Sequence, residues 1–261
     1  MFRNATRIVT TAAALLAAPI AANADSAPAC FAPSGLTRLD HAITRTATRL
    51  ADGHALKIVA LGSSSTFGTG ATSPANSYPS RLAVELRERF PAADIAVLNR
   101  GVGGEDAREM LARLEKSVIA EQPDLVLWQV GTNAIVDEEK PSAEATLVRA
   151  GLARLRARGI DVVLIDPQYA PKVIGKPRAA AMVRTLHGAA HEQNVGVFHR
   201  FAVMSYWRQA MQVPFEQFTT ADGLHMNDWG YHCFGQLLAD SLADALTRSA
   251  PTAGKSTLAL R

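Results

Sequence analysis

The sequence predicts a three-layer α/β fold, in which helices cover both faces of a five-stranded, mostly parallel sheet. Short apolar runs alternate along the chain with longer segments whose apolar residues recur at helical spacing. A chain of 261 residues is long enough for one such domain, and no internal repeat or composition break divides it. An apolar content of 48% and a charged content of 20% are typical of a globular protein.

Residues 1–24 have the pattern of a secretory signal peptide. Arg3 and Arg7 form a basic region, residues 8–20 are an apolar stretch, and "ANA" at 22–24 supplies the small residues that precede a cleavage site. An uncleaved anchor helix is the alternative, but the apolar stretch is short for a membrane span. We therefore expect cleavage at the end of this segment and a periplasmic or secreted protein.

Charge and hydropathy narrow the range of partners. The net charge is +3, of which the two arginines of residues 1–24 supply +2, and the rest of the chain has no run of lysine or arginine. We therefore expect no nucleic-acid partner. No apolar run after this segment approaches the length of a membrane span, so no transmembrane segment is expected once the signal is removed. The sequence leaves the oligomeric state open.

The chain has two cysteines, Cys30 and Cys233. An exported protein folds in an oxidising compartment, which permits a disulfide between the start of the mature chain and a region near its end. Two unrelated thiols are the alternative. We expect the bridge between Cys30 and Cys233.

The expected elements begin with a helix and a buried strand. Residues 25–56 form an N-terminal extension that contains a helix over 38–51. "KIVALG" (57–62) is an apolar run ending in glycine, which is typical of a buried parallel strand. Residues 79–90 have proline at a first helical position and apolar residues at helical spacing, so they predict a helix. "DIAVLN" (94–99) predicts the second strand.

The alternation of strands and helices continues over the rest of the domain, which spans residues 57–248. Further strands are expected at 124–131, 161–166 and 195–200. Further helices are expected at 105–120, 141–157, 177–193 and 228–248. The last residues, 249–261, are expected to form a mobile tail.

Polar and glycine-rich segments follow the strands. They are "GSSST" (62–66) after the first strand, "NRGVGG" (99–104) after the second, "GTNA" (131–134) after the third and "DGLH" (222–225) before the last helix. The carboxyl ends of parallel strands meet at one edge of a sheet, where α/β proteins bind their ligands. We therefore expect the four segments to form one site.

These segments contain the residue types that serine catalysis requires. A serine hydroxyl needs a base within hydrogen-bond reach, and the base needs a third group that fixes its tautomer. The tetrahedral intermediate needs donors aimed at its oxyanion. Serines, glycine amides, Asn133 and the pair of Asp222 and His225 supply a candidate for each requirement.

In this order and at these positions, the four segments resemble the sequence blocks of the SGNH hydrolases, also called the GDSL esterase/lipase family. The resemblance runs from about Lys57 to Leu246. It implies the SGNH hydrolase fold with a flavodoxin-like sheet, and hydrolysis of carboxylic esters through an acyl-enzyme without a metal or organic cofactor. By this resemblance Ser64 is the nucleophile, His225 is the general base and then the acid, and Asp222 orients the imidazole.

The second and third blocks imply the oxyanion donors. Gly104, at the end of "NRGVGG", is similar to the family's oxyanion glycine and donates its backbone N–H. Asn133, in "GTNA", is similar to the family's oxyanion asparagine and donates its side-chain amide. The backbone N–H of Ser64 is the third donor that the resemblance implies.

Two positions depart from the family's pattern. Ser63 stands in place of the aspartate beside the nucleophile, and Ala134 stands in place of the aspartate after the oxyanion asparagine. Neither position belongs to the catalytic set, so the resemblance still implies hydrolysis. The loss of two carboxylates near the site is expected to alter loop hydrogen bonds and substrate preference.

The sequence is also compatible with other functions. The first segment alone fits a non-catalytic, flavodoxin-like module that binds a phosphate or a glycan, although such a module does not need Asp222 and His225. A lipid esterase, a thioesterase or an acyltransferase would use the same site. We expect an exported serine esterase that acts on a small-molecule or glycan ester, with the acyl groups of envelope glycans as candidate substrates.

Other polar and aromatic residues have simpler interpretations. "HGAAH" (187–191) places two histidines four residues apart, but the motif has no acidic third ligand, which favours a surface helix over a zinc site. Asp166 ends the fourth strand and is expected to line the pocket. Alternatively, its side chain caps the turn that leads into Pro167. Trp128 and Trp229 are interpreted as packing aromatics.

Overall fold

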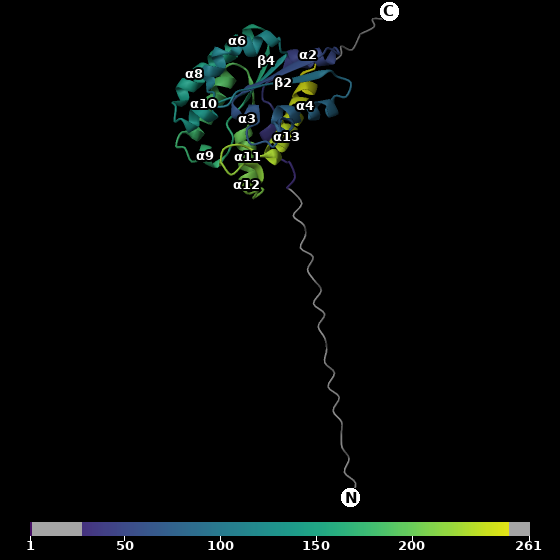
Figure 1. Ribbon diagram of the computed structural model, residues 1–261. Helices are drawn as coiled ribbons and strands as arrows, with labels where there is room; N and C mark the ends of the chain where they lie inside the picture. The colour runs from purple at the N-terminus through teal and green to yellow at the C-terminus, as the bar shows by residue number, and fades with distance from the viewer. Residues whose placement is uncertain (2–27, 251–261) are drawn as a thin grey trace, which may run out of the picture.

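The computed structural model describes Met1 and residues 28–250 (Figure 1). The expected cleavage site and residues 251–261 of the expected tail lie outside the described residues. Five parallel strands form one sheet in the order β2-β1-β3-β4-β5. Helices cover both faces of this sheet, which confirms the predicted three-layer α/β fold and its flavodoxin-like strand order.

All five strands lie where the sequence predicts them. Their bounds are Leu56–Gly62 (β1), Ile95–Gly101 (β2), Leu125–Gln129 (β3), Asp161–Ile165 (β4) and Gly196–Phe198 (β5). β3 is shorter than expected, because Gly131 adopts a left-handed conformation (φ 92°) and a helix begins at Thr132. β5 is also shorter than expected, since a helix begins at Arg200.

The longer helices lie between the strands and after the last strand. They are Thr44–Ala51 (α2), Tyr78–Arg89 (α4), Pro141–Ala157 (α8), Ala179–Glu192 (α10), Arg200–Gln209 (α11) and Asp228–Ser249 (α13). The sequence does not predict α11, because its first residue falls within the strand expected over 195–200. Within residues 28–250, no helix is both long and apolar enough to cross a membrane.

Short helices complete the connections. They are Ser34–Thr37 (α1), Ser64–Phe67 (α3), Pro74–Asn76 (η1), Ala107–Ala112 (α5), Leu114–Ser117 (α6), Ile119–Glu121 (η2), Thr132–Val136 (α7), Pro171–Ile174 (α9) and Phe215–Phe218 (α12). Most of them are too short to show a periodic apolar pattern, so the sequence does not predict them as separate elements.

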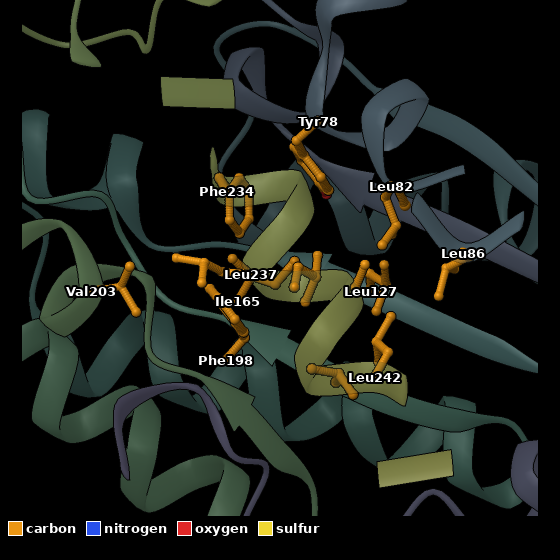
Figure 2. Packing of buried hydrophobic residues seen from close by; sticks show 14 of the residues in the cluster. Tyr78, Leu82, Leu86, Leu127, Ile165, Phe198, Val203, Phe234, Leu237 and Leu242 are labelled. Atoms are coloured by element: carbon orange, nitrogen blue, oxygen red, sulfur yellow. The ribbon is translucent and has the colours of Figure 1, made fainter. Parts of the chain in front are cut away.

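Two apolar cores lie on opposite faces of the sheet. Side chains alternate along β1, so that Ile58 and Ala60 join one core whereas Val59 and Leu61 join the other. Figure 2 shows the first core, in which side chains of α4 and α13 pack against those of β3, β4 and β5. The second core is covered by α5, α8 and α10.

The helix predicted over 38–51 begins only at Thr44. The preceding segment runs along the edge strand β5 instead. Asp40 accepts a hydrogen bond from the backbone N–H of Val197 (3.4 Å), and the backbone of His41 lies against Gly196. Contacts with the sheet therefore replace the first helical turns that the local pattern predicts.

The helix predicted over 105–120 is divided into α5, α6 and η2. The break falls at Arg113, which separates α5 from α6. The guanidinium of Arg113 donates hydrogen bonds to the carbonyl groups of Gly62 (3.3 Å) and Arg100 (2.9 Å). Long-range hydrogen bonds thus accompany the break in a segment whose local apolar pattern is helical.

The N-terminal extension is fastened to the last helix. Cys30 forms a disulfide with Cys233 of α13, with the two Cα atoms 5.0 Å apart, which confirms the predicted bridge. The indole N–H of Trp207 donates a hydrogen bond to the carbonyl of Phe31 (3.0 Å). For a sequence separation of 203 residues, the chain-entropy model gives a stabilisation of about 5 kcal/mol.

Gly151 of α8 allows a test of the packing in the second core. A methyl group at this position would overlap the indole ring of Trp128 and press on the side chain of Leu111. Trp128 is fully buried, so its ring has little room to move. We expect Gly151→Ala to lower the free energy of unfolding by about 1–3 kcal/mol in urea titrations, because overpacking outweighs the gain in helix propensity.

Gly188→Ala in α10 is the matched control. Nothing lies within 4 Å of a methyl group added at Gly188, so only helix propensity acts there. We expect this control to raise the free energy of unfolding by about 0.5–1 kcal/mol. Equal effects of the two substitutions would contradict the packing argument.

Candidate active site

The strand-to-helix turn after β1 presents Ser64. β1 ends at Gly62, and Ser64 is the first residue of α3. A side chain at position 62 would overlap the hydroxyl of Thr66, so glycine is needed for the helix to fold back this sharply on the strand. Ser63 and Ser65 are buried, whereas Ser64 is partly exposed. Of the three adjacent serines, Ser64 is therefore the one that solvent reaches.

Ser63, in place of the family's aspartate, hydrogen-bonds to Gln129. The backbone N–H and the hydroxyl of Ser63 donate to Oε1 of Gln129 at 3.0 and 3.1 Å, and the hydroxyl of Thr66 donates to the same oxygen at 3.2 Å. Gln129 is the last residue of β3 and is fully buried. An ionised carboxylate at position 63 has no proton to donate and would repel the amide oxygen of Gln129. The hydroxyl of Ser63 instead donates a hydrogen bond to this oxygen.

Ser64, His225 and Asp222 form a continuous chain of hydrogen bonds. Nε2 of His225 lies 2.9 Å from Oγ of Ser64, and Nδ1 of His225 lies 2.5 Å from Oδ2 of Asp222. The side chain of His225 is 15% exposed and that of Asp222 is 41% exposed, so the chain of bonds is open to solvent at its aspartate end. The structure thus brings together three side chains from two separate segments of the sequence.

A tight loop holds Asp222 against His225. Thr219 and Met226 form an isolated antiparallel bridge that closes the loop. Within it, Oδ1 of Asp222 accepts hydrogen bonds from the backbone N–H groups of Leu224 (2.8 Å) and His225 (3.0 Å). The loop therefore fixes both the backbone and the side chain of Asp222.

The same hydrogen bonds keep Asp222 ionised. Burial raises its pKa, but hydrogen bonds from His225, from the hydroxyl of Thr220 and from two backbone N–H groups outweigh burial and hold the pKa of Asp222 well below its usual range. An ionised carboxylate accepts a hydrogen bond from the N–H at Nδ1 of His225, and this tautomer has its lone pair on Nε2, directed at Ser64. In this tautomer His225 can remove the hydroxyl proton.

Asn133 lies beside the loop that carries Gly104. Its side-chain Nδ2 donates a hydrogen bond to the carbonyl of Glu105 (2.8 Å), the residue after Gly104. Gly104 is exposed and has a positive φ (85°), a conformation that favours glycine. Ala134, in place of the family's second aspartate, is buried in the second apolar core, where a carboxylate would be an uncompensated charge.

Asn99 ties the end of β2 to α3. Its Nδ2 donates to the carbonyl of Thr66 (2.8 Å), and its Oδ1 accepts from the N–H of Gly101 (2.9 Å). A side chain at Gly101 would overlap the backbone of Phe67. Asn99, the first residue of the second block, therefore positions the turn that carries Ser64 through the backbone of α3.

Comparison with models of protein families shows the family of the chain. Residues 29–248 match the model of the non-GDSL lipase-like family. The chain belongs to this family. Together with the fold, the match supports the SGNH-type hydrolase that the sequence blocks predict.

Three known proteins illustrate the similarity of this non-GDSL lipase-like protein to ester hydrolases. The acetylxylan esterase of Geobacillus stearothermophilus is 34% identical over 74 residues, which are 28% of this chain and 31% of that protein. The crystal structure of a two-domain esterase (CEX) active on acetylated mannans has a TM-score of 0.65 and 19% identity, covering 84% of this chain and 58% of that chain. The lipase/acylhydrolase from Enterococcus faecalis has a TM-score of 0.59 and 24% identity, covering 72% of this chain and 96% of that chain.

The chain spans less than two thirds of the length of two of these proteins. The chain matches 31% of the length of the acetylxylan esterase and 58% of the length of the two-domain esterase. The two structural similarities establish a shared fold.

Arg113 connects several parts of the candidate site in this lipase-like protein, and the sequence does not predict this role. Its guanidinium donates to the carbonyl groups of Gly62 and Arg100 and pairs with the carboxylate of Glu105 at 2.6 Å. The paired side chains are only 17% and 13% exposed, so solvent screens them little. Arg113 thereby joins the ends of β1 and β2 to the loop that carries Gly104. An arginine within a predicted amphipathic helix gives no signal for this role.

Gln168 joins two other parts of the site. Its Oε1 accepts hydrogen bonds from the hydroxyl of Thr132 (2.8 Å) and from Nη2 of Arg200 (2.8 Å), and its Nε2 donates to the carbonyl of Leu224 (3.3 Å). Thr132 begins α7, and Leu224 directly precedes the histidine of the hydrogen-bond chain. Burial lowers the pKa of Arg200 to about 10, which leaves it cationic at neutral pH.

Three other interpretations from the sequence have clear outcomes. The expectation that Asp166 lines the pocket is wrong, because its side chain is fully buried and hydrogen-bonded to His187. Trp128 is buried in the second core, as a packing aromatic should be. Trp229 packs edge to face on Trp207, with the ring centroids 5.3 Å apart.

Arg113→Met tests whether this side chain positions the site. The substitution removes the hydrogen bonds to the two strand ends and leaves Glu105 without its partner. We expect kcat for a short-chain aryl ester to fall roughly 10- to 100-fold, because small displacements of reacting groups have effects of this size. Arg108→Met, at an exposed position of α5, is the matched control and should keep kcat within a few-fold. Equal kcat in the two variants would remove Arg113 from the positioning set.

Proposed function

We propose that this non-GDSL lipase-like protein is a serine esterase that hydrolyses carboxylic esters through an acyl-enzyme. The hydrogen-bond chain from Asp222 through His225 to Ser64 is the observation that carries the proposal. A serine hydroxyl is activated when a base lies within hydrogen-bond reach, and Nε2 of His225 lies 2.9 Å from it. Family membership supports the same chemistry.

The proposed reaction has two half-reactions. Oγ of Ser64 bonds to the ester carbonyl carbon while Nε2 of His225 takes the hydroxyl proton. The tetrahedral intermediate collapses as the bond to the alcohol oxygen breaks, and His225 gives its proton to the leaving alcohol. Water then repeats these steps on the acyl-enzyme, which releases a carboxylic acid and restores Ser64. Asp222 remains ionised throughout and stabilises the imidazolium.

Three donors are proposed for the oxyanion. The backbone N–H of Ser64 lies in the first turn of α3, where N–H groups have no intrahelical acceptor. The backbone N–H of Gly104 comes from the loop after β2 and the side-chain amide of Asn133 from the first turn of α7, and the hydrogen bond from Asn133 to Glu105 holds these two segments together. Donors held in place before the reaction stabilise the developing negative charge without reorganisation.

We propose acetylated polysaccharides as the substrate class. Support comes from the acetylxylan esterase and from the esterase active on acetylated mannans. A cavity of about 460 Å³ lies beside α3, and its lining includes Phe67, Thr72 and Asn99. Phe67 is 62% exposed, so its ring can pack on a sugar. The partly exposed Ser64 leaves room for a bulky alcohol moiety.

We propose further that the protein acts in the periplasm or outside the cell. The signal-peptide pattern of residues 1–24 supports this location. The disulfide between Cys30 and Cys233 also supports it, because structural disulfides persist in oxidising compartments. Envelope glycans and extracellular polysaccharides are accessible in both places.

Ser64→Ala tests the proposed nucleophile. We expect hydrolysis of a short-chain aryl ester to fall by about 10⁴-fold or more, because no neighbouring group replaces the attacking oxygen. Ser65→Ala is the matched control, since Ser65 is adjacent but buried, and it should keep kcat within a few-fold. Circular dichroism and thermal unfolding establish that both variants fold. High activity in Ser64→Ala, or its loss in Ser65→Ala alone, would contradict the assignment.

A substrate panel tests the proposed specificity. Acetate release from acetylated xylan and mannan is compared with hydrolysis of butyryl and long-chain aryl esters and of acyl thioesters. We expect kcat/KM for acetyl esters to exceed that for long-chain esters by about tenfold or more. A preference for long-chain esters or thioesters would instead indicate a lipid esterase or thioesterase. Transfer of acetyl groups to an added sugar in preference to water would indicate an acyltransferase, and binding without turnover would indicate a glycan-binding or phosphate-binding module.

A further inference from the structure

Three potential metal ligands converge outside the hydrogen-bond chain of the candidate active site. Asp166 directly follows β4, His187 lies on α10 and His199 directly follows β5. Each offers one ligand atom, and these atoms lie within 4.8 Å of one another. Of the two histidines of "HGAAH", only His187 belongs to this cluster, and its acidic partner Asp166 comes from a distant part of the sequence.

The carboxylate of Asp166 is fully buried, and each of its oxygens has a hydrogen-bond partner. Among the described residues, its one ion-pair partner is His187, with Nε2 at 2.8 Å from Oδ2. The other oxygen, Oδ1, accepts a hydrogen bond from the N–H of Phe201 (2.8 Å). The charge of the buried Arg200 attracts this carboxylate, but the guanidinium does not hydrogen-bond to it, and its Nε donates to the backbone carbonyl of Asp166 (3.0 Å). A fully buried carboxylate is unfavourable unless a positive charge offsets it.

The two histidines are suited to ligate an ion. Burial lowers the pKa of His199, and a low pKa favours the neutral imidazole that metal ions bind. The rings of His187 and His199 meet edge to face, with centroids 4.7 Å apart. The side chain of His187 is 31% exposed, so an ion can reach the cluster from solvent.

We propose that Asp166, His187 and His199 bind a divalent transition-metal ion, with zinc the best match to two imidazoles and one carboxylate. Two ligand atoms of a tetrahedral zinc ion lie about 3.3 Å apart, given bonds of about 2.0–2.1 Å. The present distance of 2.8 Å between Nε2 of His187 and Oδ2 of Asp166 requires only a small separation of these atoms. The bound ion offsets the negative charge of the buried carboxylate. It also links the ends of β4 and β5 to α10.

A second cluster on the same helix provides a natural comparison. Asp40, His41 and His191 also place their ligand atoms within 4.8 Å of one another, and His191 lies one turn after His187 on α10. The side chain of Asp40 is 49% exposed, so water already solvates its charge. This cluster therefore lacks the buried carboxylate on which the proposal depends.

Zinc and cobalt titrations test the proposal on purified, tag-free protein with its disulfide intact, after treatment with a chelator. We expect one equivalent of Zn²⁺ to bind in calorimetry and Co²⁺ to produce visible absorption bands of a bound ion. Both cysteines are in the disulfide, so no thiolate competes for the metal. Zn²⁺ should also raise the melting temperature, because it binds the folded protein.

Variants at the two clusters identify the ligands. His187→Gln and His199→Gln are each expected to weaken Zn²⁺ affinity about tenfold or more, whereas His191→Gln should change it less than about twofold. Two separate ligand variants keep the test decisive if one of them fails to fold. The proposal would be overturned by wild-type protein that binds neither ion at millimolar concentration. It would equally be overturned by unchanged affinity in both ligand variants, or by an equal loss of affinity in His191→Gln.

Discussion

The close packing of α3 against the ends of β1 and β2 is the constraint on which the candidate site depends. Gly62 and Gly101 leave no space for a side chain between the helix and the strands. Within this contact, Asn99 and Gln129 bond to the backbone of the turn. The position of Ser64 is therefore set by contacts of glycine and amide residues before any substrate binds. The segments that carry the other groups start from the same sheet edge.

Polar side chains that are partly or fully buried connect those segments to one another. Arg113 connects two strand ends to the loop after β2, and Gln168 connects the start of α7 to the loop of the histidine. Neither belongs to the hydrogen-bond chain that reaches Ser64. Because reacting groups must be placed to within a fraction of an ångström, such residues belong to the function as well as to the fold. The cost of burying them is offset by the hydrogen bonds that they make.

The sequence predicts the parts of this protein that depend on local patterns. All five strands follow from short apolar runs, and the four polar segments identify Ser64, Asn133 and the pair of Asp222 and His225 that lies on one loop. The parts that it misses depend on contacts between distant residues. The break at Arg113 accompanies bonds to strand ends, the late start of α2 follows from contact with β5, and the burial of Asp166 is set by α10 and α11. No local periodicity contains this information.

The disulfide has a consequence for the order of events in the secretion that we propose. A chain that crosses a membrane from its N-terminus delivers Cys30 early and Cys233 only 203 residues later, within the last helix. During most of that passage Cys30 has no intramolecular partner, so it is open to oxidants and to other thiols. Because the chain has just two cysteines, no wrong internal pairing exists. In such a passage the disulfide can therefore form only after Cys233 has crossed the membrane. At that point most of the domain has crossed as well.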